Sequence, residues 1–384
     1  MKYVFKNGIC FIRVKGVVYD KSMQVLVKYP KNNDSKVFTI PSDVTSIEPG
    51  AFKKNKTLKE VKFGENVNII KEKAFKKAKL KNIIIPKDIK CIEKEAFSKC
   101  TKLKRVTMEE GVSEVGSAVF SSCTDLEKIN LPSTLKRLSS LMFSMCTSLE
   151  TIKLPSSVEE IGESCFSYCS SLKSITLPSH IKLIGERAFY LDTSLQKVEI
   201  PAGCETIENA IFKSCSSLES VTFPSGIKNL GEGIFVDCTS LKFVELGDDL
   251  KVIPDVTFKG CTSLKSLVLH PALEEIGSLA FSGCKSLKTI NLPPNLKKIG
   301  EGAFLGCSNL NALIIPATTT EIGSVALRDC SSLKNISIPQ SVVSIGQKVF
   351  ENCKKLKAIY VEKGSYADTF FTENNMKSLL KYTN

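Results

Sequence analysis

Cysteine is the residue type in this chain with the widest chemical capacity, because a thiol can act as a nucleophile, a metal ligand or a disulfide partner. The 384 residues include fifteen cysteines and two histidines. Eleven cysteines recur at intervals of 23 residues or twice that: Cys100, Cys123, Cys146, Cys169, Cys215, Cys238, Cys261, Cys284, Cys307, Cys330 and Cys353. Single thiols at this spacing do not converge on a metal, and side chains in register point alike rather than toward each other. We therefore interpret the column as buried free thiols.

No other pattern of side chains predicts catalysis. His180 and His270 lie about four repeats apart, and no cysteine or carboxylate recurs with them. The sequence has no nucleophile elbow, phosphate-binding loop, dinucleotide glycine fingerprint or H-E-x-x-H motif. Its many serines, such as Ser170 and Ser171, occupy positions that turn chemistry explains. We expect neither enzymatic activity, nor a metal, nor a cofactor.

The cysteines belong to an internal repeat. Three residues before each cysteine position stands an apolar residue that is nearly always phenylalanine: Phe52, Phe75, Phe97, Phe120, Phe143, Phe166, Phe189, Phe212, Phe235, Phe258, Phe281, Phe304, Leu327 and Phe350. A leucine column runs through all fourteen units, from Leu58 to Leu356. Where cysteine is absent, its position is taken by Asn55, Ala78 or Asp192. A fixed period of this length is typical of repeat proteins.

One unit shows why the repeats must stack. The segment 172–177 alternates apolar and polar residues, which predicts a short half-buried strand, and Pro178 ends it. A 23-residue unit cannot enclose its own apolar side, so neighbouring units bury a continuous core between them. The sequence therefore predicts one elongated domain, a solenoid with a parallel sheet along one face.

The unit from Pro155 to Leu177 resembles the BspA-like branch of the leucine-rich repeats. This resemblance implies an α/β, β-rich solenoid of fourteen repeats with the parallel sheet on its concave face. The opening segments 16–21 and 26–30 are similar to the family's first hairpin, and 363–370 is similar to its closing helix. We expect a β-hairpin cap over 1–40, the solenoid over 41–361 and a helical cap over 362–384.

The strand register indicates where a partner would bind. Residues two and four positions after each leucine point to the concave face, and most of them are small and polar. Phe243, Val268, Ala312 and Ile314 are apolar and fall within four consecutive repeats. They predict an apolar strip that contacts a protein or glycan partner, although chance variation on a β-face would also produce it.

The positive charge is concentrated near the N-terminus. Residues 1–105 hold 26 Lys and Arg against 10 Asp and Glu, an excess of 16, whereas the whole chain carries +13. Such a field favours lipid headgroups, acidic glycans or acidic proteins, and nucleic acid least, because no aromatic platform accompanies the lysines. A solvated edge that deters aggregation is the alternative. The predicted polyanion-binding residues are Lys53, Lys54, Lys56, Lys59, Lys62, Lys76, Lys77 and Lys79.

Two functional interpretations remain open. No apolar run reaches the roughly 18 residues of a membrane helix, and residues 1–16 do not read as a secretory signal. The resemblance implies a microbial or protozoan cell-surface protein that adheres to host partners. The alternative is an intracellular scaffold or regulatory module, which the free thiols and the missing signal favour. The sequence leaves the ligand and the compartment open.

Overall fold

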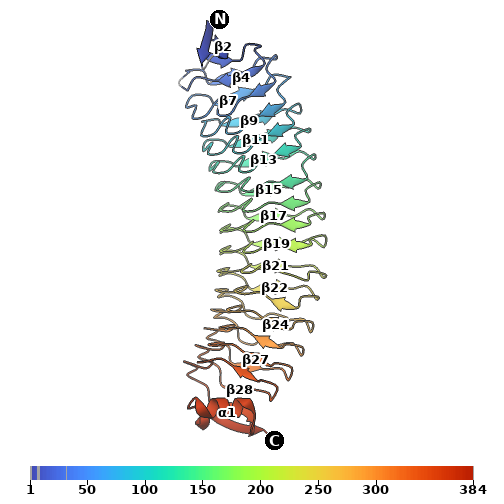
Figure 1. The fold of residues 1–384 in the computed structure, drawn as a ribbon, viewed down its shortest axis with the longest axis vertical. Coiled ribbons are helices and arrows are strands. Elements are labelled where there is room, and N and C mark those ends of the chain that lie inside the picture. Colours follow the sequence, from blue (N-terminus) through green and yellow to red (C-terminus); the bar gives the residue numbers. More distant parts are fainter. Residues whose placement is uncertain (1, 7–8, 32, 384) are drawn as a thin grey trace. The chain divides into compact units, whose positions relative to one another are not determined.

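The computed structural model describes residues 2–6, 9–31 and 33–383. The chain forms two compact units, Met1–Thr193 and Ser194–Asn384. Each unit is a β-solenoid, and the two together contain about 16 turns with almost no helix (Figure 1). The repeat architecture predicted from the sequence is confirmed. The turn count is slightly above the fourteen repeats of the leucine column because strands outside that column join the stack at both ends.

Strands of three to five residues form the first ladder of each unit, which we call the long-strand face. In the first unit these strands are β5 (Val37–Thr39), β7 (Glu60–Lys62), β9 (Asn82–Ile85), β11 (Arg105–Met108), β13 (Lys128–Asn130), β15 (Thr151–Lys153) and β17 (Ser174–Thr176). In the second unit they are β19 (Lys197–Glu199), β21 (Ser220–Thr222), β22 (Phe243–Glu245), β26 (Ala312–Ile314), β28 (Asn335–Ser337), β30 (Ala358–Glu362) and β31 (Leu380–Thr383). The pairs are parallel, as in β11–β13, where Arg105 faces Lys128.

A second parallel ladder runs along a different side of each turn. Its two-residue strands in the first unit are β6 (Ser46–Ile47), β8 (Ile69–Ile70), β10 (Cys91–Ile92), β12 (Glu114–Val115), β14 (Arg137–Leu138), β16 (Glu160–Ile161) and β18 (Leu183–Ile184). In the second unit they are β20 (Thr206–Ile207), β23 (Val252–Ile253), β24 (Glu275–Ile276), β25 (Lys298–Ile299), β27 (Glu321–Ile322) and β29 (Ser344–Ile345). We predicted a sheet along one face only, because two residues are too few to show alternation.

The N-terminal part departs from a single hairpin. Strands β1 (Lys2–Lys6), β2 (Ile9–Val14), β3 (Val17–Tyr19) and β4 (Val25–Lys28) pair antiparallel in sequence order. β4 then pairs in parallel with β6, so the antiparallel strands extend the short-strand ladder. The domain boundary at residue 40 remains a prediction.

Within the described residues, helical structure is confined to the C-terminal segment. The helix α1 (Tyr366–Glu373) is capped at its N-terminus by Ser365, whose hydroxyl accepts a hydrogen bond from the Asp368 N–H. A 3-10 turn η1 (Lys377–Leu379) leads into β31, which pairs in parallel with β30. The ring of Phe371 lies 5.6 Å from that of Phe350. The helix therefore covers the last phenylalanine of the repeat column.

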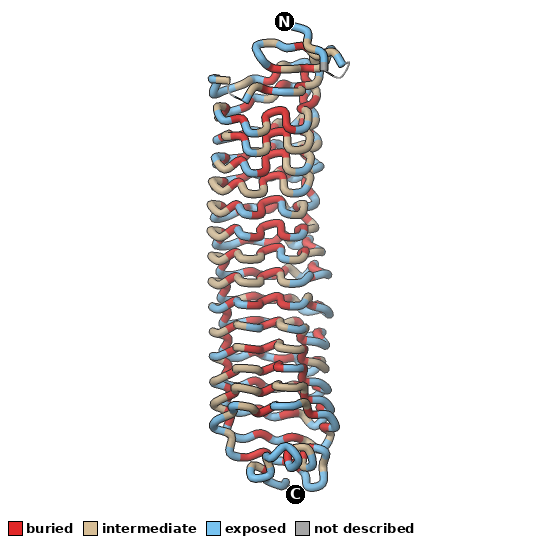
Figure 2. The backbone as a smooth tube through the Cα atoms, turned by 60° about the vertical axis from the view of Figure 1, so that its left-hand side comes forward, coloured by how far each residue is buried: buried red, intermediate tan, exposed pale blue. Residues whose placement is uncertain are grey.

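The core of each turn is a stack of phenylalanine rings. From Phe52 to Phe189 in the first unit and from Phe212 to Phe304 in the second, neighbouring ring centroids are 4.6–5.9 Å apart and the rings are within 18° of parallel. The buried residues line the inside of each turn (Figure 2). Stacking at one ring per repeat explains the fixed period, because each ring buries its neighbour.

The segment that follows each phenylalanine is a stack of tight turns. At the second residue after the phenylalanine, φ is near +60° in nearly every repeat, for example in Lys77 and Tyr168. The N–H of that residue donates to a carbonyl of the next repeat, as Tyr168 does to Tyr190 at 2.7 Å. These turns replace the helices of an α/β solenoid. They also hold the side chain at that position outside the core.

Candidate binding surfaces

The cysteine column has a structural role that packing alone does not describe. Ten of its thiols donate to the carbonyl oxygen of the phenylalanine position one repeat earlier, with Sγ–O distances of 3.0–3.3 Å. Cys100, for example, donates to Phe75 at 3.1 Å. The thiol therefore ties each turn to the one before it.

These thiols are poor nucleophiles. Burial raises the pKa of Cys100 and of Cys146 to about 12. All fifteen cysteines lie in the described residues, and none of them is paired in a disulfide there. A protonated, enclosed thiol neither attacks a substrate nor binds a metal readily.

Asp192 occupies one of the cysteine positions and is fully buried. Its Oδ1 accepts from the Cys169 N–H at 2.8 Å, whereas its Oδ2 has no hydrogen-bond partner among the described residues. Burial raises the pKa of this carboxyl well above its usual value, although the Cys169 bond opposes the shift. Asp192 is thus a buried acid that costs stability when ionised.

The predicted apolar strip is solvent-exposed on the long-strand face of the second unit. The exposed fraction is 53% for Phe243, 84% for Val268 and 78% for Ile314, and Ala312 is also exposed. Phe243 lies on β22 and pairs with Ser220 of β21. The repeat steps between Phe235 and Phe304, which carry the strip, measure 5.2–5.5 Å between rings. The four residues therefore fall within four consecutive repeats, of which the third carries Thr289 and Asn291 at these positions, and no described contact identifies what covers them.

Two of the four repeats under this strip lack an assigned strand. Residues 266–268 and 289–291, where we predicted strands, form no ladder in the structure. The inside–outside alternation nevertheless persists, because Leu267 and Ile290 are buried and Val268 is exposed. Phe243 and Ile314 thus lie on two separate sheets with a less regular segment between them.

The eight predicted polyanion-binding lysines lie on more than one side of the first unit. Those on the turns after the phenylalanine column are Lys53, Lys54, Lys56, Lys76, Lys77 and Lys79. Lys62 lies on β7 of the long-strand face, and Lys59 lies just before that strand. Because these lysines are spread over two sides, a single flat ligand cannot contact all eight.

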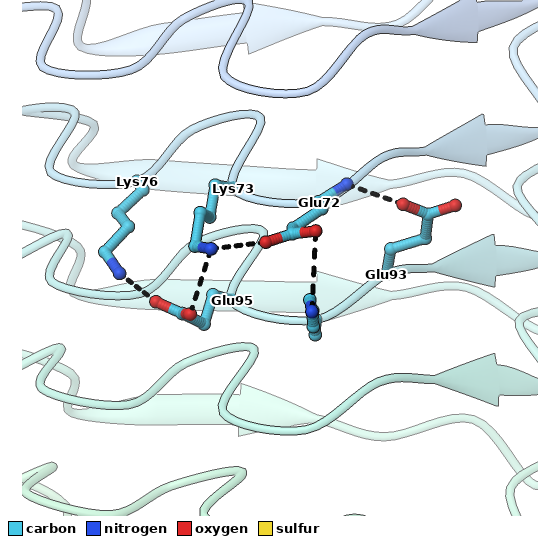
Figure 3. A network of polar contacts seen from close by, with 6 residues as sticks. Glu72, Lys73, Lys76, Glu93 and Glu95 are labelled. Carbon is cyan, nitrogen blue, oxygen red and sulfur yellow. Dashed lines mark hydrogen bonds and ion pairs between the residues drawn. The ribbon is translucent and has the colours of Figure 1, made fainter.

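Ion pairs neutralise part of the charge on the turns. Lys76 pairs with Glu95, and the Nζ of Lys73 lies 3.5 Å from the same carboxylate (Figure 3). Glu72 pairs with Lys73, and its carboxylate lies 3.6 Å from the Nζ of Lys94. The Glu72 N–H donates to the Glu93 carboxylate at 2.7 Å. The pKa of Lys76 is lowered, first by burial and then by neighbouring lysines. Lys54 and Lys77 form no ion pair in the described part of the chain.

Sequence reasoning did not predict a groove on the short-strand side of the first unit. It has a volume of about 810 Å³ and lies where the ladder is interrupted between β12 and β14. In the preceding repeat, the backbone N–H of Gly116 donates to the Ile92 carbonyl. At the interruption, Ser139 stands at the position of Gly116, and its side-chain hydroxyl donates to the equivalent Val115 carbonyl. The charged residues that line the groove are Glu72, Glu93, Lys94, Glu114, Lys136 and Arg137. This mixed charge favours no ligand of either sign.

The histidines have no site around them. His180 and His270 are both exposed. Within residues 2–6, 9–31 and 33–383, no group of three or more His, Cys, Asp or Glu side chains is placed to hold a metal. Among the same residues, no helix combines the length and the apolar character needed to cross a bilayer.

Comparison with known proteins agrees with the repeat geometry. The family described as "BspA type Leucine rich repeat region (6 copies)" matches residues 30–150, 139–265 and 251–377, which together span most of the sequence. The chain belongs to the BspA-type leucine-rich repeat family. No curated protein matches it at a significant level.

Solved structures share the BspA-type fold over the full length. A leucine-rich repeat protein from Bacteroides ovatus is 27% identical, with a TM-score of 0.70 over 100% of this chain and 98% of that one. A leucine-rich cell surface protein from Faecalibacterium prausnitzii is 24% identical, with a TM-score of 0.55 over 98% of both chains. The pneumococcal vaccine antigen PcpA is 19% identical, with a TM-score of 0.52, and covers 100% of this chain and 99% of its own. The last two show a common fold only.

Leucine-rich repeat solenoids of this type are binding scaffolds, so a role in protein interaction follows from membership of the BspA-type family.

Phe243 and Val268 were found from the strand register. The strand register does not cover the turns after each phenylalanine, where only lysines had been selected, for their charge. Reading the second residue after each phenylalanine along the repeats would have found the positions on these turns.

Proposed function

We propose that this protein is a non-enzymatic binding protein that recognises a protein or glycan partner through the long-strand face of its second unit. The observation that carries the proposal is the exposure of Phe243, Val268 and Ile314 at positions that are small and polar in most other repeats. A few residues, often aromatic, contribute most of the binding energy in a protein interface, and exposed apolar patches mark interaction sites. Polar neighbours such as Ser220 and Glu245 would form the rim.

We further propose that the partner is a host component contacted at the cell surface. The F. prausnitzii structure is named a cell surface protein and PcpA a vaccine antigen, and both share the fold of this chain. Fold likeness supports the location but does not identify a ligand.

The test is a binding screen followed by matched substitutions. The full chain is applied to arrays of extracellular-matrix proteins and glycans, and each hit is measured again with Phe243→Asp. The expected loss is at least about 30-fold, because burying a carboxylate in an apolar contact costs 2 kcal/mol or more. Thr151→Asp, at the same strand position of the first unit, is the control. Equal binding by the Phe243 variant and the control would refute the site.

The second candidate function is an intracellular interaction scaffold. The observation that favours it is the set of thiol–carbonyl bonds, which exist only while the cysteines are reduced. Antibody labelling of source cells with and without permeabilisation separates the two functions. Signal on intact cells supports the surface role, and signal only after permeabilisation supports the scaffold.

A further inference from the structure

A single column of side chains on the first unit changes from basic to apolar along its length. We call this column the turn edge, and its members are Lys54, Lys77, Lys99, Ser122, Met145 and Tyr168. Each has φ between 59° and 63°, and each N–H donates to the next repeat at 2.7–2.9 Å. The side chains therefore stand in line, one repeat apart.

The basic end of the turn edge consists of three lysines that are all exposed. Lys54, Lys77 and Lys99 make no ion pair within the described ranges, unlike the neighbouring Lys73 and Lys76. Lys77 and Lys99, together with Lys53 and Lys73, also contribute to lowering the pKa of Lys76. These lysines repel one another, and an anion bound across them would relieve the repulsion.

The apolar end begins two repeats further on. Met145 has an exposed fraction of 45% and Tyr168 of 43%, and Leu141 on the adjoining turn is exposed to 41%. The Tyr168 ring lies 5.3 Å from that of Tyr190 in an edge-to-face arrangement. In the same repeats the phenylalanines of the column are fully buried, whereas Tyr190 and Leu191 are half-buried, so Leu141, Met145 and Tyr168 are the most exposed large apolar side chains of residues 141–193.

We propose that the turn edge docks on the surface of an anionic lipid bilayer. Lys54, Lys77 and Lys99 would meet the headgroup phosphates, and Met145 and Tyr168 would enter the interface below them. A soluble polyanion would engage the lysines alone and leave the apolar end in water. A bilayer provides both negative charge and an apolar layer, and tyrosine is favoured at that boundary. This role is independent of the partner site at Phe243.

The test is sedimentation of the full chain with lipid vesicles. Vesicles of phosphatidylcholine with about 30% phosphatidylserine should bind it, and vesicles of phosphatidylcholine alone should not. The triple variant Lys54→Gln, Lys77→Gln, Lys99→Gln should lower the partition coefficient on the order of 100-fold. The matched control is Lys62→Gln, Lys128→Gln, Lys153→Gln, which removes the same charge from the long-strand face and should have a much smaller effect.

A second pair of variants separates a bilayer from a soluble polyanion. Met145→Gln with Tyr168→Asn keeps every lysine and should weaken vesicle binding about tenfold. Binding to heparin beads should be unchanged by that pair. Vesicle binding that is insensitive to the apolar pair, or equal losses in the two lysine triples, would overturn the proposal. Circular dichroism of each variant confirms that the solenoid is folded, since all the changed side chains are exposed.

Discussion

The Sγ of Cys146 lies 3.3 Å from the carbonyl oxygen of Phe120 in the preceding repeat and donates a hydrogen bond to it. Both residues are fully buried, and the same carbonyl accepts from the Cys123 N–H at 3.1 Å. The cysteine column therefore links successive turns through side chains, in addition to the two backbone ladders.

Removing one of these thiols should destabilise the unit that contains it. We expect Cys146→Ala to lower the free energy of unfolding by about 1–3 kcal/mol, because it leaves a small cavity and deletes the bond to Phe120. Cys146→Ser keeps a donor and should lose less. Urea denaturation followed by circular dichroism measures both. Cys10→Ala is the control, since that thiol is half-buried and makes a long contact, 4.0 Å, to the carbonyl of its sequence neighbour Phe11. A Cys146→Ala midpoint equal to the control's would contradict the role.

Thiol labelling should distinguish the column from the outlying cysteines. Burial raises the pKa of Cys146 to about 12, so its thiolate is scarce at about pH 8 and enclosed as well. We expect iodoacetamide to modify at most Cys10, Cys91 and Cys353 in the folded protein, because these alone are not fully buried. Intact mass spectrometry counts the adducts, and denaturant should raise the count to fifteen. Rapid labelling of Cys146 without denaturant would be evidence against the packing.

Asp192 should make the first unit less stable as the pH rises. Burial holds its folded pKa above the ordinary value of 3.8, so the folded state binds a proton that the unfolded state releases. The contribution of Asp192 to the free energy of unfolding is greatest below about pH 4 and is lost as the pH rises toward the folded pKa of this carboxyl. Asp192→Asn should raise the urea midpoint at neutral pH and flatten its fall as the pH rises above about 4. Asparagine already occurs at this repeat position as Asn55, whose side-chain amide donates to the Pro30 carbonyl at 2.9 Å. The substitution Asp192→Asn therefore introduces a side chain that the position accepts in another repeat.

The control for Asp192 is Asp88→Asn, which changes a carboxyl that is not buried. It should keep the fall in stability that we attribute to Asp192. Parallel pH profiles for the Asp192 variant and the unmodified protein would show that this carboxyl ionises normally.

Glu95 should stabilise the lysine-rich turns only modestly. Glu95→Gln removes the carboxylate that Lys73 and Lys76 share, and the side chain is partly exposed. We expect a loss of about 0.5–1 kcal/mol at low salt that shrinks as salt is added. Thermal melts at two salt concentrations measure it, with Glu65→Gln, an exposed carboxylate without an ion pair in the described residues, as the control. A loss that is independent of salt would mean that packing, not charge, is responsible.

Much of the fold could be predicted because each phenylalanine and leucine carries the same information in every repeat. Phe166 and Leu172 are buried for the reason the period indicates, and the strand after Leu172 lies where alternation predicts it. The thiol–carbonyl bond was not predictable, because its acceptor is a backbone atom 26 residues earlier. Lys54 and Lys77 were selected for their charge, but the turn edge as a column was missed because only strand positions were followed from repeat to repeat, and Met145 and Tyr168 lie outside them.

The sequence by itself determined the solenoid, its period, the buried columns and the exposure of Phe243 and Ile314, because burial of one apolar face is a local, periodic requirement. The tertiary structure alone decided that Lys54 and Lys62 lie on different sides and that the side chains of Lys99 and Met145 are exposed on the turns. It also decided that Asp192 has an oxygen without a partner. These relationships depend on how the backbone turns between strands and on which groups of the neighbouring repeat come within hydrogen-bonding distance, and neither is encoded by the period.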